Sequence, residues 1–101
     1  MRVLVKVSMP VEEGNAMAKD GFKAIQSILA QQKPEAAYFI TEDGKRTALL
    51  ILDLQDPSQM PAIAEPWFLA CNASVQFHPA MTAADLAKAG PSVEQAVKQY
   101  G

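Results

Sequence analysis

His78 and Lys6 are the two side chains of this sequence whose chemistry best suits acid–base or polarising roles. His78 is the only histidine of the chain, and an imidazole changes its charge near neutral pH. It could act as an acid or a base, and Lys6 could bind a carboxylate or polarise a carbonyl if both shared one sheet face. In the alternative interpretation, His78 is a solvated side chain at a strand end beside Pro79, and Lys6 is an exposed lysine.

Aromatic residues and one amide are the candidates for contacting a ligand. Tyr38 could donate a hydrogen bond into a pocket, and Gln76 could orient the bound molecule. Trp67 and Phe68 could form the walls of a site for a planar ligand. The alternative for all three aromatic residues is packing alone, either in a strand or in the core.

Cys71 is the only cysteine, and it lies in an apolar stretch. We therefore expect a buried thiol rather than a nucleophile. The acidic pairs Glu12-Glu13 and Glu42-Asp43 lack metal-ligand spacing with histidine or cysteine. No phosphate-binding glycine loop and no nucleophile elbow occur. The sequence predicts neither a metal site nor a dedicated cofactor site.

Length and composition indicate one globular unit, so we interpret residues 1–101 as a single domain. Half of the residues are apolar, a fifth are charged, and the net charge is −2, which is ordinary globular usage. The basic residues are spread along the chain, which argues against nucleic acid and against an anionic membrane as partners. No run is long enough for a membrane span or a signal peptide, and the single cysteine fits a reducing compartment. We predict a cytoplasmic protein.

Apolar periodicity and the Gly and Pro positions divide the chain into a β-α-β-β-α-β order with a helical tail. The predicted elements are a strand at 2–8, a helix at 14–32 capped at its start by Asn15, strands at 36–41 and 46–54, a helix starting at Ser58, and a strand at 73–78. Asp43-Gly44 indicates a hairpin turn, and Asp20-Gly21 weakens the first helix enough to break it. Pro66 is expected to kink or end the second helix and to leave 67–69 as a separate short turn. The order is typical of a ferredoxin-like α+β fold with a four-stranded antiparallel sheet.

The tail, residues 80–101, is expected to form a helical C-terminal extension. Thr82 is predicted to start the first helical piece, and Gly90 to end it. Ser92 is predicted to start the second piece, because the sequence that follows matches a capping box.

The second face of the sheet predicts a homodimer, since two helices cover one face only. The uncovered face is expected to carry Leu4, Lys6, Gln76 and His78, large aliphatic residues of the third strand, and either Tyr38 with Ile40 or Phe39. Such a face is too apolar for water and too polar for a sealed core, and two of them together would enclose a small-molecule cavity. The alternative is a monomer whose C-terminal helices fold over this face.

The stretch Pro66-Trp67-Phe68 and the strand ending in His78-Pro79 resemble segments of the dimeric α+β barrel superfamily. Members of that superfamily include antibiotic-biosynthesis-type monooxygenases and muconolactone isomerase. The stretch from Glu65 to Thr82 also resembles short bacterial proteins with no assigned function. The resemblance implies a ferredoxin-like subunit, a homodimer and a ligand pocket inside the barrel, but it implies no reaction and no catalytic set.

Three functions follow as hypotheses, because a fold of this kind serves many roles. The favoured one is a dimer that binds a small apolar or aromatic-acid ligand in the barrel. The second is a cofactor-independent isomerase or monooxygenase-like enzyme in which Lys6 and His78 act. The third is a structural or partner-binding homodimer whose barrel is filled by side chains.

Overall fold

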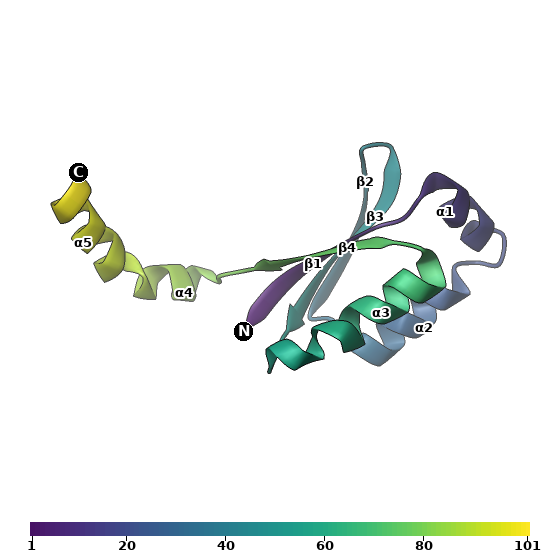
Figure 1. The fold of residues 1–101 in the computed structure, drawn as a ribbon, viewed down its shortest axis with the longest axis horizontal. Helices are drawn as coiled ribbons and strands as arrows, with labels where there is room; N and C mark the ends of the chain where they lie inside the picture. Colours follow the sequence, from purple (N-terminus) through teal and green to yellow (C-terminus); the bar gives the residue numbers. More distant parts are fainter.

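The computed structural model describes residues 1–101 as a mixed α+β fold built on a four-stranded antiparallel sheet (Figure 1). Its elements are β1 (Arg2–Ser8), α1 (Val11–Ala18), α2 (Lys23–Gln32), β2 (Ala36–Glu42), β3 (Lys45–Asp53), the 3₁₀ turn η1 (Pro57–Gln59), α3 (Met60–Cys71), β4 (Ser74–Pro79), α4 (Ala83–Lys88) and α5 (Gly90–Tyr100). The strand order is β2-β3-β1-β4, which makes β2 and β4 the edges. None of the helices is both long and apolar enough to cross a membrane.

The core lies on the face of the sheet that packs against α2 and α3. The register pairs Val5 with Leu50 of β3 and with Phe77 of β4, so that apolar residues of three neighbouring strands meet on this face. Ile28 of α2 and Trp67 of α3 cover them. Full burial of one such aliphatic side chain contributes roughly 1.5–3 kcal/mol, so this side contributes most of the apolar burial.

The first helix begins earlier than the capping pattern predicts. The predicted start at Asn15 is wrong, because α1 begins at Val11, directly after Pro10. The Asn15 side chain does not cap the helix but accepts a 3.0 Å hydrogen bond from the guanidinium of Arg46. Gly14 lets this guanidinium approach, since a Cβ at that position would lie 2.7 Å from its Nη1.

The break predicted at Asp20-Gly21 is confirmed, because α1 and α2 are separate helices. Gly21 and Phe22 both have positive φ values, 77° and 59°. This conformation is freely accessible to glycine but unfavourable for an aromatic residue. Phe22 is therefore held in a strained backbone conformation by its contacts at the start of α2.

Pro66 does not end α3. The prediction of a separate turn at 67–69 is wrong, because one helix runs from Met60 to Cys71 through the proline. The missing N–H of Pro66 removes one helix hydrogen bond. Trp67 offsets this loss, because it is fully buried and its indole N–H donates to Gln32 of α2 at 3.2 Å.

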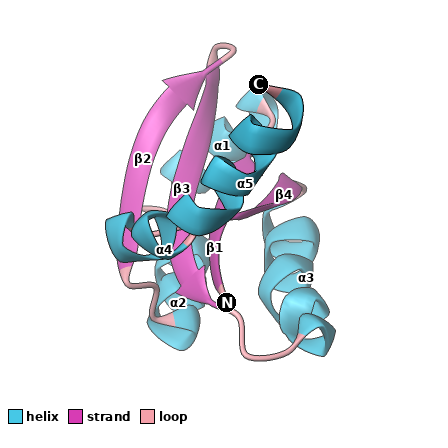
Figure 2. Cartoon of the chain, turned by 90° about the vertical axis from the view of Figure 1, so that its left-hand side faces the viewer, coloured by secondary structure: helices cyan, strands magenta, loops and turns pink.

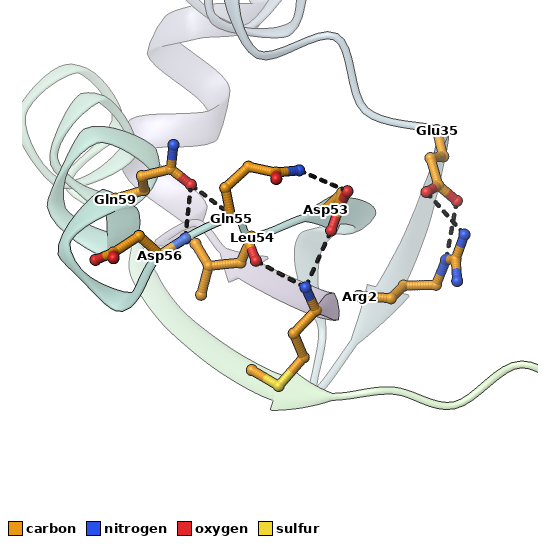
Figure 3. Close-up of polar contacts among 8 residues, drawn as sticks. Arg2, Glu35, Asp53, Leu54, Gln55, Asp56 and Gln59 are labelled. Carbon is orange, nitrogen blue, oxygen red and sulfur yellow. Dashed lines mark hydrogen bonds and ion pairs between the residues drawn. The ribbon is translucent and has the colours of Figure 1, made fainter. Parts of the chain in front are cut away.

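Polar contacts tie together the end of the sheet at which β1 begins (Figure 3). Arg2 makes two hydrogen bonds to Glu35, at 3.1 and 3.0 Å. The amino group of Met1 donates to Asp53 at 3.1 Å. Nearby, Asp56 caps η1 by accepting a 2.9 Å hydrogen bond from the backbone of Ser58. The predicted cap, Ser58, thus lies inside the turn, and the carboxylate two residues earlier takes its role.

The last two helices form an arm that projects from the end of β4 (Figure 1), and in Figure 2 they lie nearest to the viewer. We call residues 80–101 the C-terminal arm. The molecule measures 57 × 28 × 19 Å with a radius of gyration of 17.0 Å, whereas a compact chain of this length has about 13 Å. The arm's principal packing is between α4 and α5 themselves. The alternative in which these helices fold over the sheet is therefore wrong.

The boundaries inside the arm differ in part from the prediction. Thr82 starts α4 as predicted, because its hydroxyl accepts a hydrogen bond from the backbone of Asp85. Gly90 does not end a helical piece but begins α5, and Ser92 lies within that helix without capping it. Pro91 explains the earlier start, since proline is well suited to the first turn of a helix.

Candidate functional site

The face of the sheet opposite α2 and α3 is covered by no element of the chain, and we call it the open face. Strand alternation and register place on it Arg2, Leu4, Lys6 and Ser8 of β1, Ala36, Tyr38, Ile40 and Glu42 of β2, Lys45, Thr47, Leu49, Ile51 and Asp53 of β3, and Ser74, Gln76 and His78 of β4. Lys6, Gln76 and His78 therefore share one face with Leu4, as the alternation predicted. For the second strand, the sequence left open whether Tyr38 with Ile40 or Phe39 lies on this face, and the register places Tyr38 and Ile40 there.

One cross-strand row of the open face brings three of the candidate residues together. Gln76 is opposite Lys6, Lys6 is opposite Leu49, and Leu49 is opposite Tyr38. Tyr38 is 65% exposed, so its ring and hydroxyl are available on this face. The row runs from the polar edge strand β4 to the aromatic side chain on β2, with an aliphatic side chain between them.

Lys6 and Glu42 form an ion pair that crosses β3. Around this pair lies a hollow of about 190 Å³, which we call the polar hollow. Its lining residues are Lys6, Ser8, Glu42, Asp43, Lys45, Ser74 and Gln76. Two ammonium groups, two carboxylates, two hydroxyls and one amide thus surround it, so it offers both donors and acceptors to a small polar group.

His78 shares the open face with Lys6 but does not join the polar hollow. His78 is opposite Leu4, two residues along β4 from Gln76. The Lys6 ammonium pairs with Glu42 on β2, the edge strand opposite β4. The exposed imidazole has no side-chain hydrogen-bond partner, so the two candidate catalytic residues do not act on each other within one chain.

An aliphatic strip lies beside the polar hollow. Leu4, Leu49 and Ile51 are half-buried on the open face, and Ile40 is 40% exposed. An antiparallel sheet that faces water normally carries polar residues on that side. The open face therefore combines an unusually apolar centre with two charged ends, Lys6 with Glu42 at one and Arg2 with Asp53 at the other.

The other two aromatic candidates lie away from the open face. Trp67 is part of the core on the helix side and lines none of the hollows. Phe68 is 40% exposed on α3, also on that side. The core-packing interpretation describes Trp67, and neither residue can meet a ligand held over Lys6 in the same chain.

A second hollow, which the sequence reasoning missed, lies on the helix side between α2 and β2. We call it the helix-side groove, and its volume is about 520 Å³. It is lined by Met9, Phe22, Ile25, Gln26, Leu29, Phe39, Ile40, Thr41, Arg46 and Thr47. Phe39 is 57% exposed because the helices do not cover β2. The available signal was the run Tyr38-Phe39-Ile40, which is apolar on both faces of the strand.

Cys71 and the acidic residues give no further reactive centre. Cys71 is fully buried, and this burial, together with Glu13 nearby, raises the pKa of its thiol. A neutral thiol is a poor nucleophile. No group of three or more histidine, cysteine, aspartate or glutamate side chains is placed to hold a metal ion.

A scan against protein-family models and a search of curated proteins found no match to this chain. The fold and the open face therefore carry the functional argument.

Proposed function

We propose that this chain is the ferredoxin-like subunit of a dimeric α+β barrel, which holds a small ligand between two sheets. The element order, with α1 and α2 together between the first two strands, and the central position of β1 beside β3 support the ferredoxin-like assignment. The observation that carries the proposal is the open face. Its centre is aliphatic, its end at Lys6 is charged, and nothing in the chain covers it.

Pairing of two open faces would remove the aliphatic strip from water. Tyr38 and Ile40 extend this strip to the edge of the sheet, where they are 65% and 40% exposed. Sheets that pack face to face lie about 10 Å apart, with side chains from both filling the layer. Short side chains at Ser8 and Ser74 leave the polar hollow unfilled, so that a second sheet would close it into a cavity.

The side chains around this cavity favour an aromatic or apolar acid as the ligand. The Lys6 ammonium, which pairs with Glu42 and belongs to a residue opposite Leu49 of the apolar strip, would also bind the carboxylate. Tyr38 and Gln76 lie in the same cross-strand row and would orient the ring of the ligand. Pockets of this kind combine apolar walls with a few polar groups that fix orientation.

Replacement of Lys6, the cation opposite Leu49 of the apolar strip, tests the proposal. With salicylate as the probe, we expect Lys6→Met to raise the dissociation constant at least tenfold, which corresponds to about 1.4 kcal/mol. NMR titration of the backbone amides measures this, with the largest shifts expected in β1 and β2. Lys19→Met is the matched control, because Lys19 is exposed at the end of α1 and lies off the open face.

Native mass spectrometry of the purified chain tests the assembly separately. A dimer, with or without a retained small molecule, supports the pairing of open faces. A monomer at micromolar concentration contradicts the proposal. Equal salicylate binding by the Lys6→Met and Lys19→Met variants contradicts the ligand site but leaves the dimer standing.

The enzyme hypothesis has one observation in its favour, the exposed imidazole of His78 on the open face without a hydrogen-bond partner. Against it, Lys6 is paired with Glu42 and does not meet His78 within the chain. We therefore rank it second. If the wild-type chain converts an aromatic acid and His78→Gln still binds this acid but no longer converts it, the enzyme hypothesis would rank first.

A further inference from the structure

The C-terminal arm carries an apolar stripe that its own chain leaves uncovered. Val93, Val97 and Tyr100 recur at helical spacing on α5 and are 57%, 61% and 82% exposed, and Leu86 of α4 is 58% exposed. Gln95 and Lys98 lie on the opposite side of the helix. Isolated helices as short as α4 and α5 are marginal in water, so the arm requires a surface to pack against.

The helix-side groove is the largest apolar hollow of the same chain and has no occupant. Its walls are Ile25 and Leu29 of α2 and the exposed ring of Phe39 on β2. The groove lies beside the edge strand β2, whereas the arm leaves the sheet from the opposite edge strand, β4. The arm also points away from the sheet (Figure 1). Its own groove is therefore not the surface that it meets.

We propose that the C-terminal arm of one copy lies in the helix-side groove of a second copy, so that the two chains exchange arms. This step rests on the proposed face-to-face dimer. When two sheets face each other across a two-fold axis parallel to their strands, the edge order is reversed. The strand β4 of one copy then meets β2 of the other, the edge beside which the groove lies. The two-fold symmetry makes the exchange mutual.

The size of the exchanged surface fits a stable dimer. Met81 adds a fifth large apolar side chain to the arm, and it is 65% exposed. At roughly 100 Å² for each large side chain, one arm buries about 500 Å² of its own surface, so two arms bury about 1,000 Å², to which the covered walls of the two grooves add. Stable interfaces bury about 1,200–2,000 Å² in total.

The charge of the arm argues against a lipid surface as the occupant. Helices that lie on membranes carry lysine and arginine on their polar face. The arm carries two acidic and two basic residues, Asp85, Glu94, Lys88 and Lys98, and is therefore neutral overall. A protein surface with an apolar groove is a better match for such a stripe than an anionic membrane.

Cross-linking between two singly substituted chains tests the exchange. One chain carries Thr41→Cys at the groove and the other, isotopically labelled, carries Val97→Cys on the stripe of α5. The native thiol, Cys71, is fully buried and does not compete. With a short bismaleimide, we expect the mixed sample to give labelled–unlabelled pairs. Gln95→Cys, on the polar side of α5, is the matched control and should react several-fold less.

Two results would overturn the inference. One is an efficient cross-link within a single chain that carries both Thr41→Cys and Val97→Cys, which would place the arm in its own groove. The other is a dimer by light scattering in which Val97→Cys and Gln95→Cys cross-link equally weakly. In that second case the proposed face-to-face dimer survives and only the arm exchange fails, whereas a monomer removes both.

A second variant keeps the test valid if the cysteine substitutions perturb the groove. Val97→Glu puts a charge into the apolar stripe of α5, whose principal packing within the chain is against α4, so the sheet should fold as before. We expect its dimer dissociation constant to rise at least tenfold. Gln95→Glu adds the same charge on the polar side and should leave the constant within about twofold. Equal constants for the two variants would contradict the exchange.

Discussion

At the scale of single residues, the structure separates side chains that the sequence could only name together. Lys6, Gln76 and Tyr38 share one cross-strand row because strand alternation and register decide their positions, and alternation can be read from sequence. Trp67 could not be placed in this way, because its position depends on α3 continuing through Pro66. Burial of a large ring and its hydrogen bond to α2 outweighed the local cost of the proline.

Asp56 gives a prediction at this scale for the dependence of stability on pH. Its carboxylate accepts hydrogen bonds from Ser58, which lowers its pKa below the ordinary value of 3.8. A lowered pKa in the folded state means that the stabilisation is fully present above the ordinary value and is lost as the pH falls through the folded value. We expect the urea concentration at the unfolding midpoint to decrease once the pH drops below about 4. Asp56→Asn keeps a side-chain acceptor but not the charge, so its midpoint should fall less steeply.

The same measurement has a clear contrary outcome. If the wild-type chain and Asp56→Asn lose stability in parallel between pH 5 and pH 2, the cap does not contribute through its charge. Asp53 and Asp85 also have pKa values lowered by hydrogen bonds, from the Met1 amino group and from Thr82. They remain in both proteins, so the difference between the two curves isolates Asp56.

At the scale of elements, the four strands could be predicted, whereas the helix boundaries could not. The β-branched alternation of β1 and the Asp43-Gly44 turn are local signals, and the structure confirms both. Boundaries depended on contacts that no local pattern shows. Asn15 is an example, because it is suited to capping a helix but is engaged by Arg46 of β3. The helix-side groove was missed for a similar reason, since it exists only because α2 leaves β2 uncovered.

The β2–β3 hairpin gives a prediction with an internal control. Asp43 and Gly44 have φ values of 53° and 72°, the left-handed pair that a tight two-residue turn requires. A Cβ at Gly44 would meet no atom within 4 Å, so Gly44→Ala adds backbone strain alone and should destabilise the fold by about 1–2 kcal/mol. Gly90→Ala also meets open space but at an ordinary φ, and its urea midpoint should stay unchanged or rise slightly. An unchanged midpoint for Gly44→Ala would contradict the left-handed turn.

At the scale of the whole molecule, the single chain is extended and leaves three apolar surfaces uncovered. The chain has a radius of gyration of 17.0 Å. In this extended form an apolar sheet face, an apolar groove and an apolar arm are all in contact with water. Each of the three would be unfavourable alone. The open face lies opposite the helix layer, and the arm and the groove lie at opposite edges of the sheet, so one two-fold pairing can cover all of them.

This reasoning predicts that thermal stability depends on protein concentration. If folding and association are coupled, the folded dimer gains about 1.4 kcal/mol for each tenfold rise in concentration, and Tm should rise by about 3–6 °C. Val97→Glu removes part of the interface, so at equal concentration its Tm should lie below that of Gln95→Glu. Thermal melts followed by circular dichroism at about 2, 20 and 200 μM protein measure both effects. A Tm that stays constant across the series would show that one chain folds alone, with its open face and its arm exposed to water.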